Sequence, residues 1–209
     1  MTEAQNVDDF AVPADQRYFE DYEPGATYEF GSVTVTEQEI VEFASRYDPQ
    51  SFHIDPVAAQ EGPFGGLIAS GWHSCALMMR LFAEHYLSTV ASLGSPGVDE
   101  LRWVKPVRPG DRLHLRVRVV DTRLSRSDPG RGVVRTFAEL VDEVGEPVLT
   151  VTVVSLLRAR GGGAAGGDGG GGGGAESGGA APAPTAPPAS GLPSRPERRR
   201  RRGSRSPPR

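Results

Sequence analysis

The segment WHSCALMMRLFAEHYLSTVASLG, residues 72–94, is mostly apolar and decides the fold of this chain. A helix drawn through it carries apolar side chains on nearly every side, Leu77 and Met78 among them. A helix that is apolar nearly all round belongs in the interior of a protein. We therefore predict one long, central, buried helix here, and we expect Gly94 and Pro96 to end it.

Segments with β-strand character lie on both sides of that helix in the sequence. Residues 112–124, RLHLRVRVVDTRL, alternate apolar and polar side chains with the period of two that is typical of a half-buried strand. Further strands are predicted at about residues 28–35, 97–107, 133–142 and 147–160, most of them separated by short turns. A short helix at residues 37–47 is predicted from the capping box formed by Thr36 and Glu39.

Packing these parts together gives an α+β fold, a curved antiparallel sheet wrapped around one long central helix. Because such a sheet leaves an edge unpaired, association with a second copy of the chain is favoured.

Composition divides the chain into three parts. Residues 1–13 resemble a disordered lead-in, residues 14–160 form one folded domain, and residues 161–209 are a tail rich in Gly, Pro and Arg. The tail contains one large apolar residue, Leu192, so it cannot bury enough surface to offset the entropy lost on ordering. We therefore predict a disordered tail.

Charge is divided in the same way. The eight Arg of the tail outnumber its three carboxylates by five, and because the whole chain carries −4, residues 1–160 carry −9. An acidic domain is a poor partner for nucleic acid, so we predict no specific nucleic-acid binding. The run RRRRRGSR at residues 198–205 is either a solvated tail or a non-specific contact for polyanions.

The cellular compartment is predicted from what the sequence lacks. Cys75 is the one cysteine, which excludes an internal disulfide and fits a reducing compartment. No basic-then-apolar signal segment opens the chain, and no run of 18 apolar residues occurs. We therefore expect a cytoplasmic protein that makes no membrane contact.

Chemistry is suggested by the segment RYDPQSFHIDP, residues 46–56. Asp48 precedes Pro49, and because a residue before proline avoids the helical conformation, the first helix should end there. His53 follows five residues after Asp48, across a predicted loop. A histidine can exchange a proton with water near neutral pH, and a nearby carboxylate can orient it. The segment therefore holds either an acid/base pair or a helix-ending Asp beside an unrelated His.

Two other positions precede helices. Asp55, followed by Pro56, is predicted to be a helix N-cap. Gly71 stands where the apolar helix begins, and backbone N–H groups at a helix N-terminus suit an oxyanion. The glycine and the preceding Ser70 are explained equally by a tight turn with a serine N-cap.

Three segments in this order resemble the MaoC-like dehydratases, hot-dog-fold proteins related to the (R)-specific enoyl-CoA hydratases. They are YDPQSFHIDPVAA (47–59), FGGLIASGWHS (64–74) and LRWVKPVRPGDRL (101–113). The resemblance covers roughly residues 17–160. It implies a long central helix in a curled antiparallel sheet, and a homodimer in which the two sheets join.

The resemblance also implies a catalytic pair. The family pattern D-x-N-P-x-H separates its Asp and His by five residues, and Asp48 and His53 occupy those two positions. The interior departs from the pattern, with Pro49 and Gln50 where x and Asn are usual, which bears on the substrate more than on the reaction. The implied reaction hydrates a trans-2-enoyl-CoA or dehydrates a 3-hydroxyacyl-CoA. Asp48 and His53 would activate water, and the Gly71 N–H would stabilise the thioester oxyanion.

No metal and no cofactor beyond the CoA thioester substrate is expected from this resemblance. Phe52 and Trp72 are candidates for an acyl pocket, although aromatic core explains them equally well. Ser70 either binds near the thioester or caps the helix. Lys105 and Arg108 either meet the phosphates of CoA or are strand-end charges beside a turn.

Two other functions fit the same fold. A hot-dog acyl-CoA thioesterase commonly places an acidic residue on the central helix, whereas the front of this helix offers His73 and no carboxylate before Glu84. A non-catalytic acyl-CoA-binding partner subunit would not need the Asp48/His53 spacing to be kept.

Overall fold

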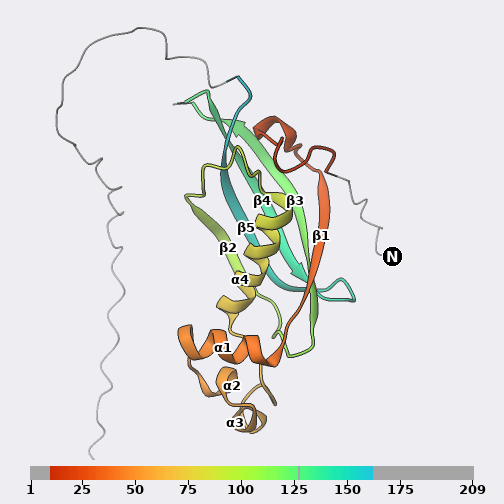
Figure 1. The fold of residues 1–209 in the computed structure, drawn as a ribbon, viewed down its shortest axis with the longest axis vertical. Helices are drawn as coiled ribbons and strands as arrows, with labels where there is room; N and C mark the ends of the chain where they lie inside the picture. The colour runs from red at the N-terminus through yellow and green to blue at the C-terminus, as the bar shows by residue number, and fades with distance from the viewer. Residues whose placement is uncertain (1–9, 127, 162–209) are drawn as a thin grey trace, which may run out of the picture. The chain divides into compact units, whose positions relative to one another are not determined.

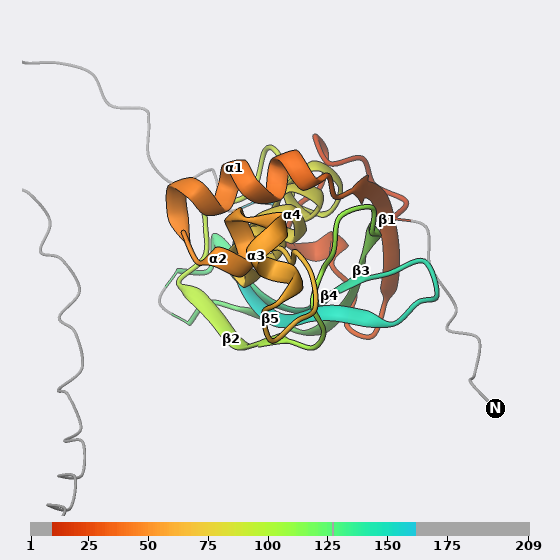
Figure 2. The same cartoon turned by 90° about the horizontal axis from the view of Figure 1, so that it is seen from below.

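The computed structural model describes residues 10–126 and 128–161. Within them, a five-stranded antiparallel sheet of order β1–β3–β4–β5–β2 curves around helix α4 (Figures 1 and 2). The strands are β1 (Thr27–Thr34), β2 (Gly97–Trp103), β3 (Arg112–Leu124), β4 (Arg131–Val141) and β5 (Pro147–Arg158). The predicted α+β architecture, a curved antiparallel sheet around a central helix, is confirmed.

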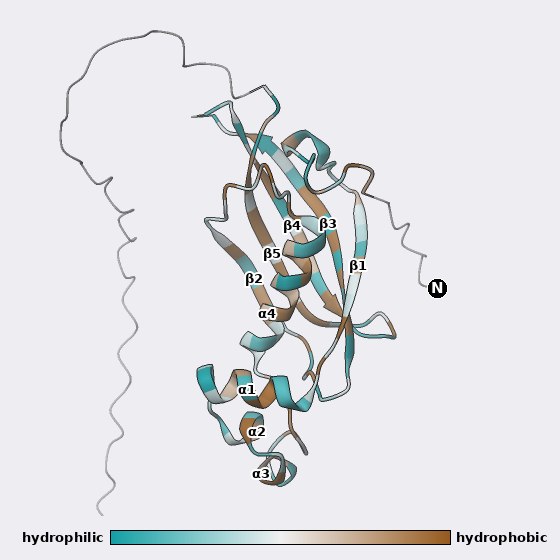
Figure 3. Cartoon of the chain, in the orientation of Figure 1, coloured by the Kyte–Doolittle hydropathy of each residue, from teal (hydrophilic) through white to brown (hydrophobic). Residues whose placement is uncertain are grey.

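The core lies between the inner face of the sheet and α4 (Gly71–Leu81). The predicted alternation in β3 is confirmed, because every second side chain there is almost completely buried: Leu113, Leu115, Val117 and Val119. Apolar residues recur along the strands behind α4 (Figure 3). Burial of each such side chain stabilises the fold by roughly 1.5–3 kcal/mol, before the entropy of ordering is subtracted.

Three short helices gather at the end of the sheet where α4 begins (Figures 1 and 2): α1 (Glu37–Tyr47), α2 (Ser51–Ile54) and α3 (Pro56–Gln60). The predicted capping box of α1 is confirmed, since the Glu39 N–H donates to Thr36 Oγ1 at 3.2 Å and the Thr36 N–H donates to Glu39 Oε2 at 3.1 Å. The predicted cap of α3 is confirmed as well, because Asp55 Oδ1 accepts the N–H groups of Val57 and Ala58.

The connection after Asp48 is not the plain loop that the sequence predicts. Residues 51–54 form the helical turn α2, in which the His53 N–H donates to the Gln50 carbonyl and the Asp55 N–H donates to the Ser51 carbonyl. The signal was missed because a single turn is too short to show helical periodicity.

The central helix ends earlier than predicted. A π-helical turn, η2 (Phe82–Tyr86), follows α4, and Leu87 is extended, so the helix stops well before Gly94. Side chains from elsewhere replace the missing helical partners. Arg17 and Tyr22 donate to the Tyr86 carbonyl at 2.6 and 3.1 Å. These contacts come from distant sequence, so local pattern could not show them.

The prediction that the central helix is buried is confirmed for only part of α4 in this single chain. Trp72 is 59% exposed and Met79 is 43% exposed, whereas Leu77, Met78 and Leu81 face the core. One side of α4 is therefore apolar and uncovered.

The packed region begins before residue 14, at Phe10. The Phe10 ring stacks on Tyr28, with 4.6 Å between centroids, and the Arg17 guanidinium lies 3.4 Å above it. A short 3-10 turn, η1 (Phe19–Asp21), follows. The rest of the predicted lead-in, residues 1–9, and the predicted tail beyond Gly161 lie outside the described residues.

We predict that Arg17→Met lowers the free energy of unfolding by roughly 2–4 kcal/mol, because one buried and two partly buried carbonyls each lose a hydrogen-bond donor. Arg17 is 4% exposed and donates to the carbonyls of Val12, His85 and Tyr86. Urea denaturation measures the change.

The matched control is Arg158→Met, which changes an exposed arginine and should alter stability by less than about 0.5 kcal/mol. Equal stabilities for the two variants would contradict the role given to Arg17.

Candidate active site

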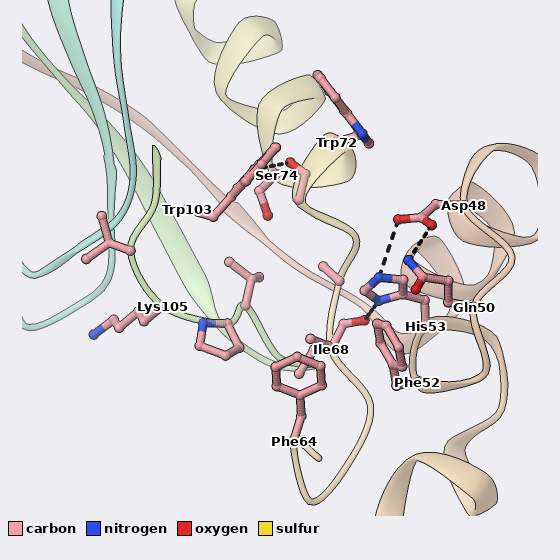
Figure 4. A pocket seen from close by; sticks show the side chains of 15 residues that line it. Asp48, Gln50, Phe52, His53, Phe64, Ile68, Trp72, Ser74, Trp103 and Lys105 are labelled. Carbon is pink, nitrogen blue, oxygen red and sulfur yellow. Dashed lines mark hydrogen bonds and ion pairs between the residues drawn. The ribbon is translucent and has the colours of Figure 1, made fainter. Parts of the chain in front are cut away.

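The junction between α1 and α2 brings Asp48 and His53 together. Asp48 is the C-cap of α1, with its N–H donating to the Ala44 carbonyl, and Pro49 prevents the helix from continuing. The turn of α2 then carries His53 back toward the end of α1. His53 Nε2 lies 3.4 Å from Asp48 Oδ2 (Figure 4).

The hydrogen bonds of His53 determine which nitrogen carries its proton. Nδ1 lies 2.8 Å from the carbonyl oxygen of Ile68, and a carbonyl can only accept, so Nδ1 is the protonated nitrogen of the neutral ring. Nε2 then presents a lone pair beside Asp48. The residue is 4% exposed, so packing holds this orientation. The result is a proton acceptor aimed in one direction.

Asp48 is held as a carboxylate by donors on both oxygens. Ser70 Oγ donates to Oδ2 at 2.7 Å, and Gln50 Nε2 donates to Oδ1 at 2.8 Å. The hydrogen bond from Ser70, with a smaller contribution from Gln50, lowers the pKa of Asp48 below its ordinary value against the opposing effect of burial. Asp48 therefore remains ionised near neutral pH and is a weak base.

The N-terminus of α4 forms another part of the site. Ser70 is its N-cap, one of the two roles that the sequence left open, since Oγ accepts the Trp72 N–H at 3.2 Å. Gly71 is the first residue of the helix, and an N–H at that position has no acceptor within the helix. It can therefore donate to a bound oxyanion.

Trp103 lies directly against Gly71. Its indole Nε1–H donates to the Gly71 carbonyl at 2.8 Å, and a Cβ added to Gly71 would lie 2.5 Å from two atoms of the indole ring. The glycine is therefore required here by a close aromatic contact, quite apart from any role of its N–H.

These elements enclose a pocket of about 430 Å³, within the range of small-molecule sites (Figure 4). Six of the residues predicted from the sequence to act in catalysis or binding line it: Asp48, Phe52, His53, Gly71, Trp72 and Lys105. The remaining wall is largely apolar and aromatic, formed by Phe64, Ile68, Trp103 and Val107 among others. The Asp48/His53 pair thus opens into a cavity suited to an apolar chain.

Two predicted substrate contacts, Ser70 and Arg108, do not line this pocket. Ser70 is 0% exposed and lies behind Asp48, whereas the Arg108 guanidinium donates to the Phe64 carbonyl at 2.6 Å. Lys105 lines the pocket, but its ammonium is bound to Asp142 and to Glu146, the latter at 2.9 Å. A role for Lys105 in binding phosphate would have to compete with these carboxylates.

Sequence reasoning missed Trp103 and gave no role to Gln50. The signal for Gln50 was its position two residues after Asp48, from which an amide can reach back to the carboxylate. Nothing local distinguishes Trp103 from an ordinary strand residue. His73, at the front of α4, is a packed ring: burial lowers its pKa, and it stacks on Phe43 with 4.8 Å between ring centroids.

The pattern of the MaoC like domain matches residues 20–139, more than half of the chain. The chain belongs to this family. The fold described above is accordingly the hot-dog fold, and the Asp48/His53 pair lies within the matched residues.

Comparisons of this MaoC-like protein with individual relatives support the same family assignment. It is 35% identical to the MaoC-like dehydratase from Rhodospirillum rubrum, whose crystal structure superposes with a TM-score of 0.64 over 69% of this chain and 98% of that one. It is 34% identical over 116 residues to 3-hydroxyacyl-thioester dehydratase Z of Mycobacterium tuberculosis, a match that covers 54% of this chain and 73% of that protein.

The R-hydratase PhaJ1 from Pseudomonas aeruginosa, at 22% identity and a TM-score of 0.55, shares the fold over 68% of this chain and 86% of that one. None of the helices in the described part of this MaoC-like protein is long and apolar enough to cross a membrane.

We predict that Gly71→Ala lowers the free energy of unfolding by roughly 1–3 kcal/mol, because the new methyl group collides with the Trp103 indole. Alanine is intrinsically a better helix former than glycine, so helix propensity alone would raise the free energy of unfolding. A decrease can come only from the collision. Urea denaturation of Gly71→Ala, Trp103→Leu and the double variant measures the coupling.

In the double variant the effect of the Gly71→Ala substitution should largely disappear, because the shorter side chain at position 103 leaves room for the methyl group. A Gly71→Ala variant as stable as the wild type would contradict the close contact.

Proposed function

We propose that this MaoC-like protein adds water reversibly across the double bond of a trans-2-enoyl-CoA thioester, giving a 3-hydroxyacyl-CoA. One observation carries the proposal. His53 Nε2 and Asp48 Oδ2 are two acceptors 3.4 Å apart at the wall of an apolar pocket. A water molecule has two O–H donors, so it can donate to both and be held between them.

The roles of the two residues follow from their hydrogen bonds. His53 is the base. Its ring proton is on Nδ1, where it is donated to the Ile68 carbonyl, so the lone pair on Nε2 can accept a proton from water. Asp48 orients the water and stabilises the imidazolium as it forms. Its own basicity is reduced by the donors Ser70 and Gln50, so it does not compete for the proton.

In the proposed reaction one proton passes from the water to His53 and from His53 to the substrate. As His53 Nε2 takes a proton from the water, the oxygen bonds to Cβ and the π electrons move through Cα onto the thioester oxygen. The Gly71 N–H at the start of α4 stabilises that negative charge. The proton then passes from His53 to Cα, so the neutral imidazole is restored. Dehydration follows the same steps in reverse.

The alternative functions are less well supported. Helix α4 itself, GWHSCALMMRL, contains no Asp or Glu that could serve a thioesterase, and Glu84 beyond it is exposed and paired with Arg80. A purely binding subunit gives no reason for the ordered donors around Asp48. Release of free thiol would reveal a thioesterase, and CoA-ester binding without turnover would reveal the binding subunit.

We predict that His53→Ala and Asp48→Asn each lower kcat/KM for enoyl-CoA hydration by about 10²–10⁴-fold, because each removes a group that holds or deprotonates the water. The loss of the enoyl-thioester absorbance band measures the rate, with a panel of trans-2-enoyl-CoAs of different length and branching.

The control is Asp55→Asn, a nearby carboxylate that only caps α3 and whose replacement remains a good N-cap. Its activity should match the wild type. Near-wild-type turnover in either His53→Ala or Asp48→Asn would contradict the proposed mechanism.

We also propose that the protein is a homodimer. Strand β2 is an edge of the sheet, and large apolar side chains on and beside it are about half exposed, including Val98, Trp103 and Val104. Together with Trp72 and Met79 of α4 they make an apolar surface of the kind that pairs with another protein chain.

We predict a mass by light scattering of about twice the 22.3 kDa of one chain at micromolar concentration, because a second copy would cover this surface. A mass of one chain over that concentration range would contradict the dimer.

A further inference from the structure

Ser70 occupies an unusual place between the two halves of the site. It is 0% exposed, yet its side chain contacts both the end of α1 and the start of α4. Its Oγ lies 2.7 Å from Asp48 Oδ2 and 3.2 Å from the Trp72 backbone nitrogen. The helix cap and the proposed catalytic carboxylate therefore share one hydroxyl.

The chemistry of a hydroxyl determines the direction of both bonds. The Trp72 nitrogen can only donate, so Ser70 Oγ accepts there. The ionised Asp48 can only accept, so the one hydroxyl proton of Ser70 points at Oδ2. Because each neighbour has a single possible role, the orientation of the hydroxyl is fixed without any reference to substrate.

The backbone of Ser70 is fixed by the same helix. Its carbonyl accepts the Ser74 N–H at 3.1 Å, in the first turn of α4. The peptide bond that joins Ser70 to Gly71 also carries the Gly71 N–H. One residue thus sets the position of the Asp48 oxygen nearest to His53 and the direction of the proposed oxyanion donor.

We propose that Ser70 is a positioning residue that fixes Asp48 Oδ2 relative to His53 Nε2 and to the Gly71 N–H, and that it makes no contact with substrate. This inference rests on the proposed hydratase function for its effect on rate, but the contact with Asp48 can be tested without any substrate.

The competing explanation is that Ser70 is an N-cap and nothing more. Thr36 supplies the comparison, because it caps α1 through the same type of bond, at the end of that helix far from Asp48. A cap alone affects stability only. A positioning residue also affects the ionisation of Asp48, because a hydrogen bond donated to a carboxylate favours its charged form.

The experiment compares the wild type with Ser70→Ala, Ser70→Gly and Thr36→Ala. Glycine is tolerated at an N-cap, so Ser70→Gly removes the bond to Asp48 while α4 is retained. The pKa of Asp48 is followed by ¹³C NMR of its carboxyl carbon as a function of pH. Steady-state kinetics with an accepted trans-2-enoyl-CoA give kcat and KM separately.

Both Ser70 variants should raise the pKa of Asp48 and lower kcat by about 10- to 100-fold with KM little changed, because a hydrogen bond to a charged group is lost from a residue that substrate does not touch. Thr36→Ala should lose stability and leave the Asp48 pKa and kcat unchanged.

An unchanged Asp48 pKa in both Ser70 variants would overturn the inference, as would an effect confined to KM. Unchanged kcat in an active enzyme would do the same. If the wild type hydrated no enoyl-CoA, the proposed function would fail, whereas the titration would still decide whether Ser70 fixes Asp48.

Discussion

The backbone groups at the two ends of the central helix need hydrogen-bond partners, and much of this structure is arranged to supply them. At the C-terminal end, Arg17 and Tyr22 donate to the carbonyl of Tyr86. At the N-terminal end, Ser70 accepts the N–H of Trp72. Ser70 and Tyr86, at these two ends, are almost fully buried, so a backbone group left without a partner beside them would cost about 1–3 kcal/mol.

The functional site is a consequence of the N-terminal arrangement. Gly71, the first residue of α4, lines the pocket, and the N-terminus of a helix is where a developing negative charge would be stabilised. The same serine that caps the helix donates to Asp48, so one side chain connects the start of α4 to the carboxylate. The same hydroxyl therefore serves both the helix cap and the hydrogen bond to Asp48.

Much of the fold could be predicted because its signals are local. The alternation in β3, the capping box of Thr36 and Glu39, and the cap formed by Asp55 depend on neighbours within a few residues. Pro49 and the short spacing brought Asp48 and His53 into question as a pair, but those residues alone left an unrelated histidine open, and the resemblance to the family pattern was needed to favour the pair. The early end of the central helix was not predictable, because the groups that bind its last carbonyls are distant in sequence: Arg17 lies 69 residues from Tyr86.

The sequence by itself therefore determined most of the elements, their caps and the short spacing between Asp48 and His53, since these depend on neighbours within one turn or one strand. Only the tertiary structure decided what those residues face. It placed Trp103 against Gly71, bound Lys105 to Asp142 and Glu146, and buried Ser70 behind Asp48. Each of these contacts joins segments more than 20 residues apart, and their side chains meet only because the sheet curves around α4.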